Sequence, residues 1–220
     1  MLAFFEVISN SSIILSVILS FLLMIRFSRL SLVLKFIAIY IIVGASFDVV
    51  SAAFYEQKEN NLLFLHLFTI FEFILLSKFF QSIFRFLNSK FNILYITIFG
   101  SIFLVANSLF VQTIDIYNSY SHSIVSAIII AYCIHFFVLI LEYSNSSKEF
   151  AIIKWFVICL FFLHSVSLIV ILFGNLMMDV SRDLQSYVWT FRGIVILATK
   201  IVMTIFFARL LLLNSEKVNT

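Results

Sequence analysis

The 220-residue chain contains no proline and only four glycines. Transmembrane helices tolerate both residues well, and transporters with discontinuous helices use them at the breaks. Their scarcity predicts uninterrupted helices and argues against a transporter that is built on broken helices.

Charged residues and cysteines are also few. Only 11% of the residues are charged and 63% are apolar, whereas a soluble domain is about one quarter charged and about half apolar. A soluble fold this apolar cannot cover its core with polar surface, so lipid is the expected solvent. The net charge of +3 gives no basic face for nucleic acid. Cys133 and Cys159 fall inside apolar stretches, which predicts apolar filling and not a disulfide framework or a metal site.

Seven apolar stretches approach or exceed the roughly 20 residues that a helix needs to cross a bilayer. Short polar connections join them, so we expect one all-α membrane domain over residues 1–220, a seven-transmembrane-helix bundle. The first stretch has its basic residues after the apolar core, as an anchor does, and not before it, as a cleavable signal does. The predicted spans are 4–25, 36–55, 62–83, 91–111, 122–141, 152–174 and 188–213.

Lysine and arginine alternate between the connections. Cytoplasmic loops carry the excess of these residues, so the side that holds most of them is predicted to be cytoplasmic. The N-terminus is therefore expected outside and the C-terminus in the cytoplasm. The residues on the predicted cytoplasmic side are Arg26, Arg29, Lys35, Lys78, Arg85, Lys90, Lys148, Lys154, Arg209 and Lys217.

Several ionisable side chains fall at bilayer depth, where each costs about 2.5–3.5 kcal/mol on the insertion scale and usually faces the bundle interior or a wet cavity. Glu72 and Lys200 lie near the centres of the third and seventh spans. We expect that they can pair, either as a salt bridge that fixes helix register or as part of an ion or ligand site. His164 lies near the middle of the sixth span. A lone histidine in a bundle is usually a hydrogen-bonded packing residue, and a role as ligand or proton carrier gains weight if His164 neighbours Glu72 or Lys200.

The second span has one small, polar face, on which Gly44, Asp48, Ser51 and Tyr55 recur at helical spacing. Small residues let helices approach closely and polar residues bond across them, so this face is expected to point inward. Asp48 carries its only charge, and we expect it to line an outward-facing polar pocket with His66, Asn107, His122 and Arg192. The candidate ligand-binding or ion-pathway residues are Asp48, His66, Glu72, Asn107, His164, Arg192 and Lys200.

The sequence lacks the common catalytic and phosphate-binding motifs, namely His-Glu-x-x-His, Gly-x-Ser-x-Gly and a glycine-rich phosphate loop. We therefore predict no catalytic residue, no metal site and no cofactor. A lysine in the seventh span invites comparison with retinal proteins. The third span lacks their aspartate-threonine pattern and the sixth lacks proline, so a retinal Schiff base at Lys200 is disfavoured.

The segments from His66 to Ser77 and from Trp189 to Lys200 resemble parts of an uncharacterised family of small bacterial seven-helix integral membrane proteins. In spacing and length the resemblance covers the whole chain. It implies the seven-helix topology in a bacterial cytoplasmic (inner) membrane and transfers no activity. It also implies a neutral polar residue at the position of Lys200, so a Glu72–Lys200 pair is expected to be particular to this chain.

Three functions are consistent with these features. The preferred one is a membrane sensor or accessory subunit that binds a small ligand or responds to the bilayer. Because the tail after residue 213 is short, we expect its output to pass through a cytoplasmic or membrane protein partner. The second is a small transporter or channel, with a homo-oligomer as one option, and the third is an intramembrane enzyme that acts on lipid with His and acidic residues as acid and base.

Overall fold

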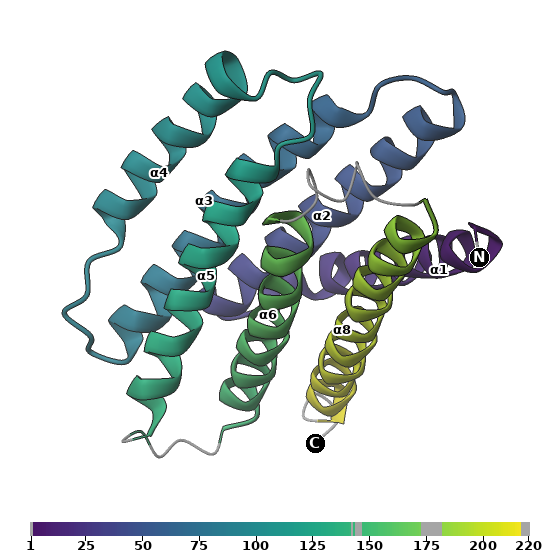
Figure 1. Cartoon of the computed structure of the whole chain (residues 1–220). Coiled ribbons are helices and arrows are strands. Elements are labelled where there is room, and N and C mark those ends of the chain that lie inside the picture. The colour runs from purple at the N-terminus through teal and green to yellow at the C-terminus, as the bar shows by residue number, and fades with distance from the viewer. Residues whose placement is uncertain (1, 142, 144–146, 173–181, 217–220) are drawn as a thin grey trace.

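The chain folds as a bundle of long helices in the computed structural model (Figure 1). The structure describes residues 2–141, 143, 147–172 and 182–216, and no strand occurs among them. In that part of the chain, 7 helices are long and apolar enough to span a membrane, which confirms the predicted all-α fold with seven apolar helices. They are α1 (Leu2–Arg26), α2 (Leu32–Glu56), α3 (Leu62–Phe86), α4 (Leu94–Ala106, continued by the π-helical turn η2, Asn107–Val111), α5 (Ser119–Ile140), α6 (Lys148–Leu172) and α8 (Arg182–Glu216).

Most helices extend past the ends that the apolar pattern predicts. α2 begins at Leu32, before residue 36, and α8 begins at Arg182, before residue 188. A helix satisfies its own backbone groups and can continue into the polar interface, whereas the apolar pattern marks only the hydrocarbon layer. α4 instead begins later than predicted, at Leu94, whose backbone N–H donates to the side chain of Asn92 over 3.0 Å. The predicted end of the sixth span at Gly174 and the basic residue Lys217 lie outside the described residues.

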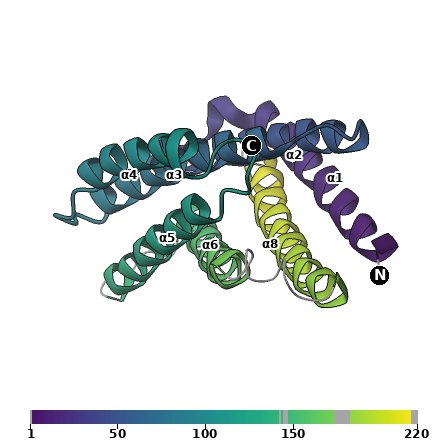
Figure 2. The same ribbon diagram turned by 45° about the horizontal axis from the view of Figure 1, so that its top comes forward.

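Six of the helices form a closed ring. Contacts join α1 to α2, α2 to α3, α3 to α5, α5 to α6, α6 to α8, and α8 back to α1. Figure 2 shows α2, α3 and α4 in one row and α5, α6 and α8 in a second row, with α1 beside α2 and α8. α4 packs against α3 on the outside of the ring, and only 11% of its most apolar stretch is buried, against 44% for α6. The ring thus has an interior that α4 does not reach.

Consecutive helices run in opposite directions, so the connections alternate between two ends of the bundle (Figure 1). We name the end with Arg26, Arg29, Lys90 and Lys148 the basic end. The opposite end, which includes the connections between α2 and α3 and between η2 and α5, is named the acidic end after three residues, Glu56, Glu59 and Asp115.

The interior toward the basic end is a solid apolar core that is rich in phenylalanine. Phe79 of α3 meets Phe156 of α6 at 5.1 Å between ring centres, and Phe80 meets Tyr132 of α5 at 5.4 Å. All four side chains are at most 2% exposed. Lipid is as apolar as these side chains, so dispersion contacts and ring geometry hold the helices together, and each aromatic pair adds about 0.5–1.5 kcal/mol.

Gly100 of α4 lies in close contact with α3. A Cβ atom added there would lie 2.6 Å from the ring of Phe73, which is fully buried, whereas a Cβ added at Gly44 would lie 3.7 Å from the ring of Phe68. We predict that Gly100→Ala lowers the free energy of unfolding by about 1–3 kcal/mol, the usual effect of overpacking. Gly44→Ala should be neutral or stabilising, since alanine favours a helix by about 1 kcal/mol over glycine.

Equilibrium unfolding of both variants in detergent micelles measures the difference. Adding Phe73→Leu to Gly100→Ala should recover part of the loss, because a smaller side chain makes room for the methyl group. Equal stability of the two alanine variants would contradict this account of the contact between α3 and α4.

Candidate functional site

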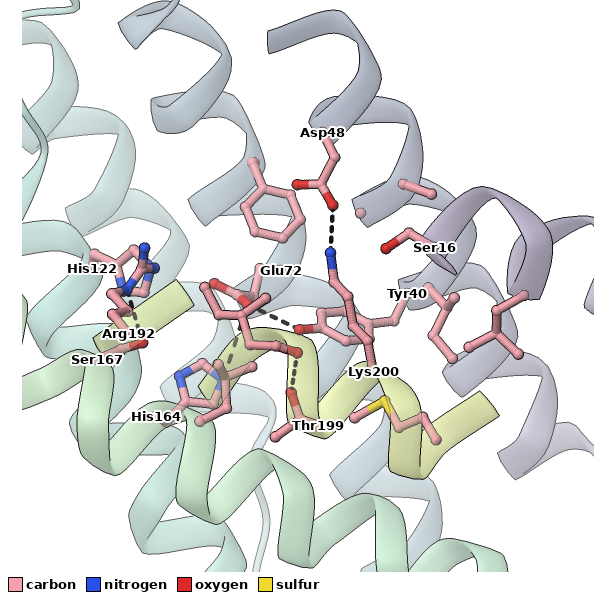
Figure 3. A pocket seen from close by; sticks show the side chains of 18 of the residues that line it. Ser16, Tyr40, Asp48, Glu72, His122, His164, Ser167, Arg192, Thr199 and Lys200 are labelled. Carbon is pink, nitrogen blue, oxygen red and sulfur yellow. Dashed lines mark hydrogen bonds and ion pairs between the residues drawn. The ribbon is translucent and has the colours of Figure 1, made fainter. Parts of the chain in front are cut away.

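A cavity of about 250 Å³ lies inside the ring (Figure 3). All six ring helices contribute residues to its wall, and α4 contributes none. The cavity lies between the apolar core and the acidic end. Its polar lining residues are Ser16, Tyr40, Asp48, Glu72, His122, His164, Ser167, Arg192, Thr199 and Lys200.

Part of the face of α2 that was predicted to point inward, Gly44 and Asp48, forms one wall of the cavity, whereas Tyr55 of the same face is 76% exposed. Tyr40, Gly44 and Asp48 follow one another at intervals of four residues and all line the cavity. Gly44 has no side chain, and the nearest atom to a Cβ built there is 3.7 Å away. A small residue between two polar ones therefore leaves room for a cavity in the middle of this face.

Lys200 pairs with Asp48. The Nζ atom donates to Oδ2 over 2.8 Å, which ties α8 to α2 across the cavity. The side chains are 22% and 41% exposed, so the pair lies at the edge of the cavity. The predicted pairing of Lys200 with Glu72 is wrong, because Asp48 lies closer to the lysine in the folded ring.

Glu72 lies deeper in the same cavity and is 3% exposed. The hydroxyl of Tyr40 donates to its Oε1 atom over 3.2 Å, and Nε2 of His164 lies 3.9 Å from the same oxygen. Neither Oε2 of Glu72 nor Nε2 of His164 has a hydrogen-bond partner within the described part of the chain. Such groups are rare in native proteins, since an unpaired polar atom loses its hydration without compensation.

A single hydroxyl connects two histidines behind Glu72. Ser126 Oγ lies 3.2 Å from Nδ1 of His164 and 3.3 Å from Nδ1 of His122. A serine hydroxyl can donate to one ring nitrogen and accept from another, so Ser126 can link the two histidines. On its other side, the ring of His164 neighbours Glu72. This neighbour is the condition under which the sequence favours a role for His164 as ligand or proton carrier.

Arg192 reaches the cavity from α8. Its Nε atom donates to Ser167 Oγ over 3.3 Å, and its guanidinium carbon lies 5.8 Å from the ring centre of Trp189. Trp189 in turn meets Tyr117 edge-on at 5.8 Å. Burial raises the pKa of Tyr117, and the nearby Arg192 guanidinium offsets part of that rise. No carboxylate of the described residues lies within ion-pair distance of Arg192.

His66 and Asn107 do not line the cavity, so their predicted place in the polar pocket is wrong. His66 bonds through its two ring nitrogens to Ser108 Oγ at 2.8 Å and to the carbonyl of Ile116 at 2.9 Å. Asn107 donates to Ser121 Oγ over 2.8 Å. Both face a buried network that ties the connection between η2 and α5 to α3, and this network gives them a structural role.

Five of the seven predicted candidates come together in the cavity, namely Asp48, Glu72, His164, Arg192 and Lys200. Tyr40 and Ser126 were missed. The spacing of Tyr40 from Gly44 and Asp48 is a signal that could have found it, as is the spacing of Ser126 from His122. Among the residues that the structure describes, no group of three or more His, Cys, Asp or Glu side chains is arranged to hold a metal ion.

Comparison of the chain with protein-family models, with curated proteins and with solved structures gave no match. The resemblance to small bacterial seven-helix proteins stays a prediction, and function is argued from the cavity alone.

The Asp48–Lys200 pair gives a direct test of this geometry. Asp48→Asn and Lys200→Met should each destabilise the protein, because each leaves a charge without its partner at the edge of the cavity. In a double-mutant cycle we predict a coupling energy of about 0.5–3 kcal/mol between these two positions. The cycle is measured by equilibrium unfolding in micelles.

The matched cycle combines Lys200→Met with Glu72→Gln and should give a smaller coupling. A stronger coupling of Lys200 to Glu72 than to Asp48 would show that the pairing is assigned to the wrong carboxylate.

Proposed function

We propose that this chain is a membrane sensor or accessory subunit that binds a small molecule in the cavity of its helix ring. The carrying observation is that Asp48, Glu72, His164, Arg192 and Lys200 converge on one cavity from four different helices. Buried ionisable residues in a bundle usually serve a ligand, an ion or a proton, because they are too costly to keep as packing.

The shape of the interior supports binding over conduction. The polar groups lie toward the acidic end, and the interior toward the basic end is filled by Phe79, Phe80, Phe136 and Phe156, each at most 2% exposed. A pore needs a continuous polar path or a narrow apolar gate that opens. A solid aromatic core of several layers fits a site that is reached from one end.

The charge of the connections supports an orientation for this site. The excess of Lys and Arg at the basic end favours placing that end in the cytoplasm of a bacterial inner membrane. The cavity then opens toward the outside, the N-terminus lies outside, and the C-terminus lies in the cytoplasm. In this orientation the basic connections and α8 are positioned to pass the ligand-bound state to a cytoplasmic or membrane partner.

A cavity-filling variant tests the binding role. Ala45 of α2 lines the cavity and is 5% exposed, whereas Val49, one turn away, is 44% exposed on the outside of the bundle. We predict that Ala45→Phe abolishes ligand binding and Val49→Phe preserves it. The measurement is the thermal stability of each purified protein with a panel of amino acids, alkyl carboxylates, alkylamines, sugars and nucleosides.

A compound that stabilises the wild type and Val49→Phe but not Ala45→Phe is the expected result. A panel without any compound that distinguishes the wild type from Ala45→Phe would contradict the binding role.

Cross-linking in cells tests the accessory role, which fails if no protein is captured specifically through the basic connections.

A small transporter is the second candidate, and the chain from Glu72 through His164 and Ser126 to His122 favours it. Three of these groups can carry a proton, and they follow one another within the ring. Proton flux into liposomes that enclose a pH-sensitive dye separates the two functions. The sensor predicts flux equal to that of empty liposomes, whereas a flux that Glu72→Gln and Lys200→Met remove would establish the transporter.

The lipid-modifying enzyme stays the third hypothesis. An acid and a base are present in the cavity, but the sequence carries no recognisable motif that would assign a nucleophile.

A further inference from the structure

The cavity holds two ionisable side chains of opposite sign that form no ion pair with a Lys, Arg, Asp or Glu side chain in the described part of the chain. Lys200 and Asp48 neutralise each other at 2.8 Å. The remaining charged residues of the lining are Arg192 and Glu72, and they form no ion pair with each other within 4.0 Å. A buried charge without an oppositely charged partner is costly, so this pair favours a ligand that carries both complementary charges.

We propose that the ligand is a small zwitterion, with an ammonium group that faces Glu72 and an acidic group that faces Arg192. This inference rests on the proposed binding function and names the chemical class of the ligand. A single molecule with a positive and a negative group a few ångströms apart would compensate both side chains in the cavity.

The guanidinium of Arg192 is oriented so that it can bind an acidic group. Ser167 occupies its Nε atom at 3.3 Å, and Trp189 lies under the guanidinium at 5.8 Å. These two contacts orient the planar group, while no described acceptor is bonded to its terminal nitrogens. A guanidinium fork with free terminal N–H groups binds a carboxylate or phosphate through two parallel hydrogen bonds.

The carboxylate of Glu72 has an oxygen atom available to accept from an ammonium group. Tyr40 donates to Oε1, and Oε2 is buried without a partner. The nearest described nitrogen, Nε2 of His164, is 3.9 Å from Oε1, beyond hydrogen-bond distance, and is also unpartnered. An ammonium has three donors, so it can bond to Oε2 and to the basic form of this histidine nitrogen together. Figure 3 shows Glu72 between Tyr40 and His164, with a dashed line to each.

The remaining wall and the volume limit the rest of the ligand. Leu65, Phe68, Leu163 and Met203 give the cavity an apolar side that fits a short aliphatic group. The volume of about 250 Å³ lies below the roughly 300–1,000 Å³ of pockets for drug-sized molecules. An amino acid with an aliphatic side chain carries both charges, has a short apolar group and is small enough for this volume. The aminoethyl phosphate headgroup of a lipid carries the same pair of charges and is the other source of this chemistry.

Isosteric probes separate the two charges. Leucine carries both groups, 4-methylpentanoate lacks the ammonium, and 3-methylbutylamine lacks the carboxylate. O-phosphoethanolamine represents the lipid headgroup. Binding of each to the purified wild-type protein is measured by isothermal titration calorimetry in detergent. We expect leucine or O-phosphoethanolamine to bind at least tenfold more tightly than either single-charge probe, and the better of the two identifies the source.

Two variants assign each charge to its partner. Arg192→Gln should weaken zwitterion binding at least tenfold and leave 3-methylbutylamine unaffected, whereas Glu72→Gln should weaken it similarly and leave 4-methylpentanoate unaffected. Arg85→Gln at the basic end is the matched control and should bind as the wild type does. The comparison of probes on the wild type tests the proposal even if a variant fails to fold.

A single-charge probe that binds the wild type as tightly as both zwitterions would overturn the inference and leave the binding function intact. The same holds if neither zwitterion binds but another compound distinguishes the wild type from Ala45→Phe. If no compound makes that distinction, the proposed function fails as well.

Discussion

The hydrocarbon around the bundle offers no hydrogen bonds, and this constraint determines where the polar side chains of the chain lie. Each one must find a partner inside the protein or face a cavity. Two groups of polar side chains in the described residues meet this demand differently. The side chains of His66 and Asn107 form hydrogen bonds within a buried network, whereas Glu72 and Arg192 line the cavity, and Oε2 of Glu72 has no described hydrogen-bond partner. The difference separates polar side chains that are bonded within the fold from those that are available to a ligand.

The interior of the ring differs between the two ends of the bundle, and this difference gives the cavity its position. Toward the basic end, aromatic rings fill the ring of helices, while toward the acidic end the same helices carry Ser16, Asp48, His164 and Arg192. The Asp48–Lys200 pair lies at the edge of the cavity, and Glu72 lies deeper.

The sequence was sufficient to predict the helices, but not which side chains on different helices contact one another. Apolar length identifies every span, and the small, polar face of α2 predicts correctly that Asp48 points inward. The partner of Lys200 was assigned wrongly because depth along a helix does not reveal which neighbour it faces. That choice depends on the order of the helices in the ring and on rotations of less than one turn, and both are set by packing against several helices at once.

The error at His66 and Asn107 has a different cause. Both residues lie near the acidic end, as the cavity does, but α4 packs outside the ring and η2 turns Asn107 toward α5. Nothing in the composition of α4 distinguishes a peripheral helix from a ring helix, since all seven spans are similarly apolar. Tyr40 was not predicted as a site residue, because tyrosine is common in apolar helices and its role here depends on its hydrogen bond to Glu72.

The central claim, a wet cavity that is reached from one side only, is tested most directly by cysteine accessibility. In a background with Cys133→Ala and Cys159→Ala, single cysteines replace Ser167 and Thr199 in the cavity and Ser77 in the apolar core. A charged, membrane-impermeant thiol reagent is applied to whole cells and to inverted vesicles. We expect labelling of Ser167→Cys and Thr199→Cys from outside only, and no labelling of Ser77→Cys. Labelling of the cavity positions from both sides, or from neither, would contradict the account.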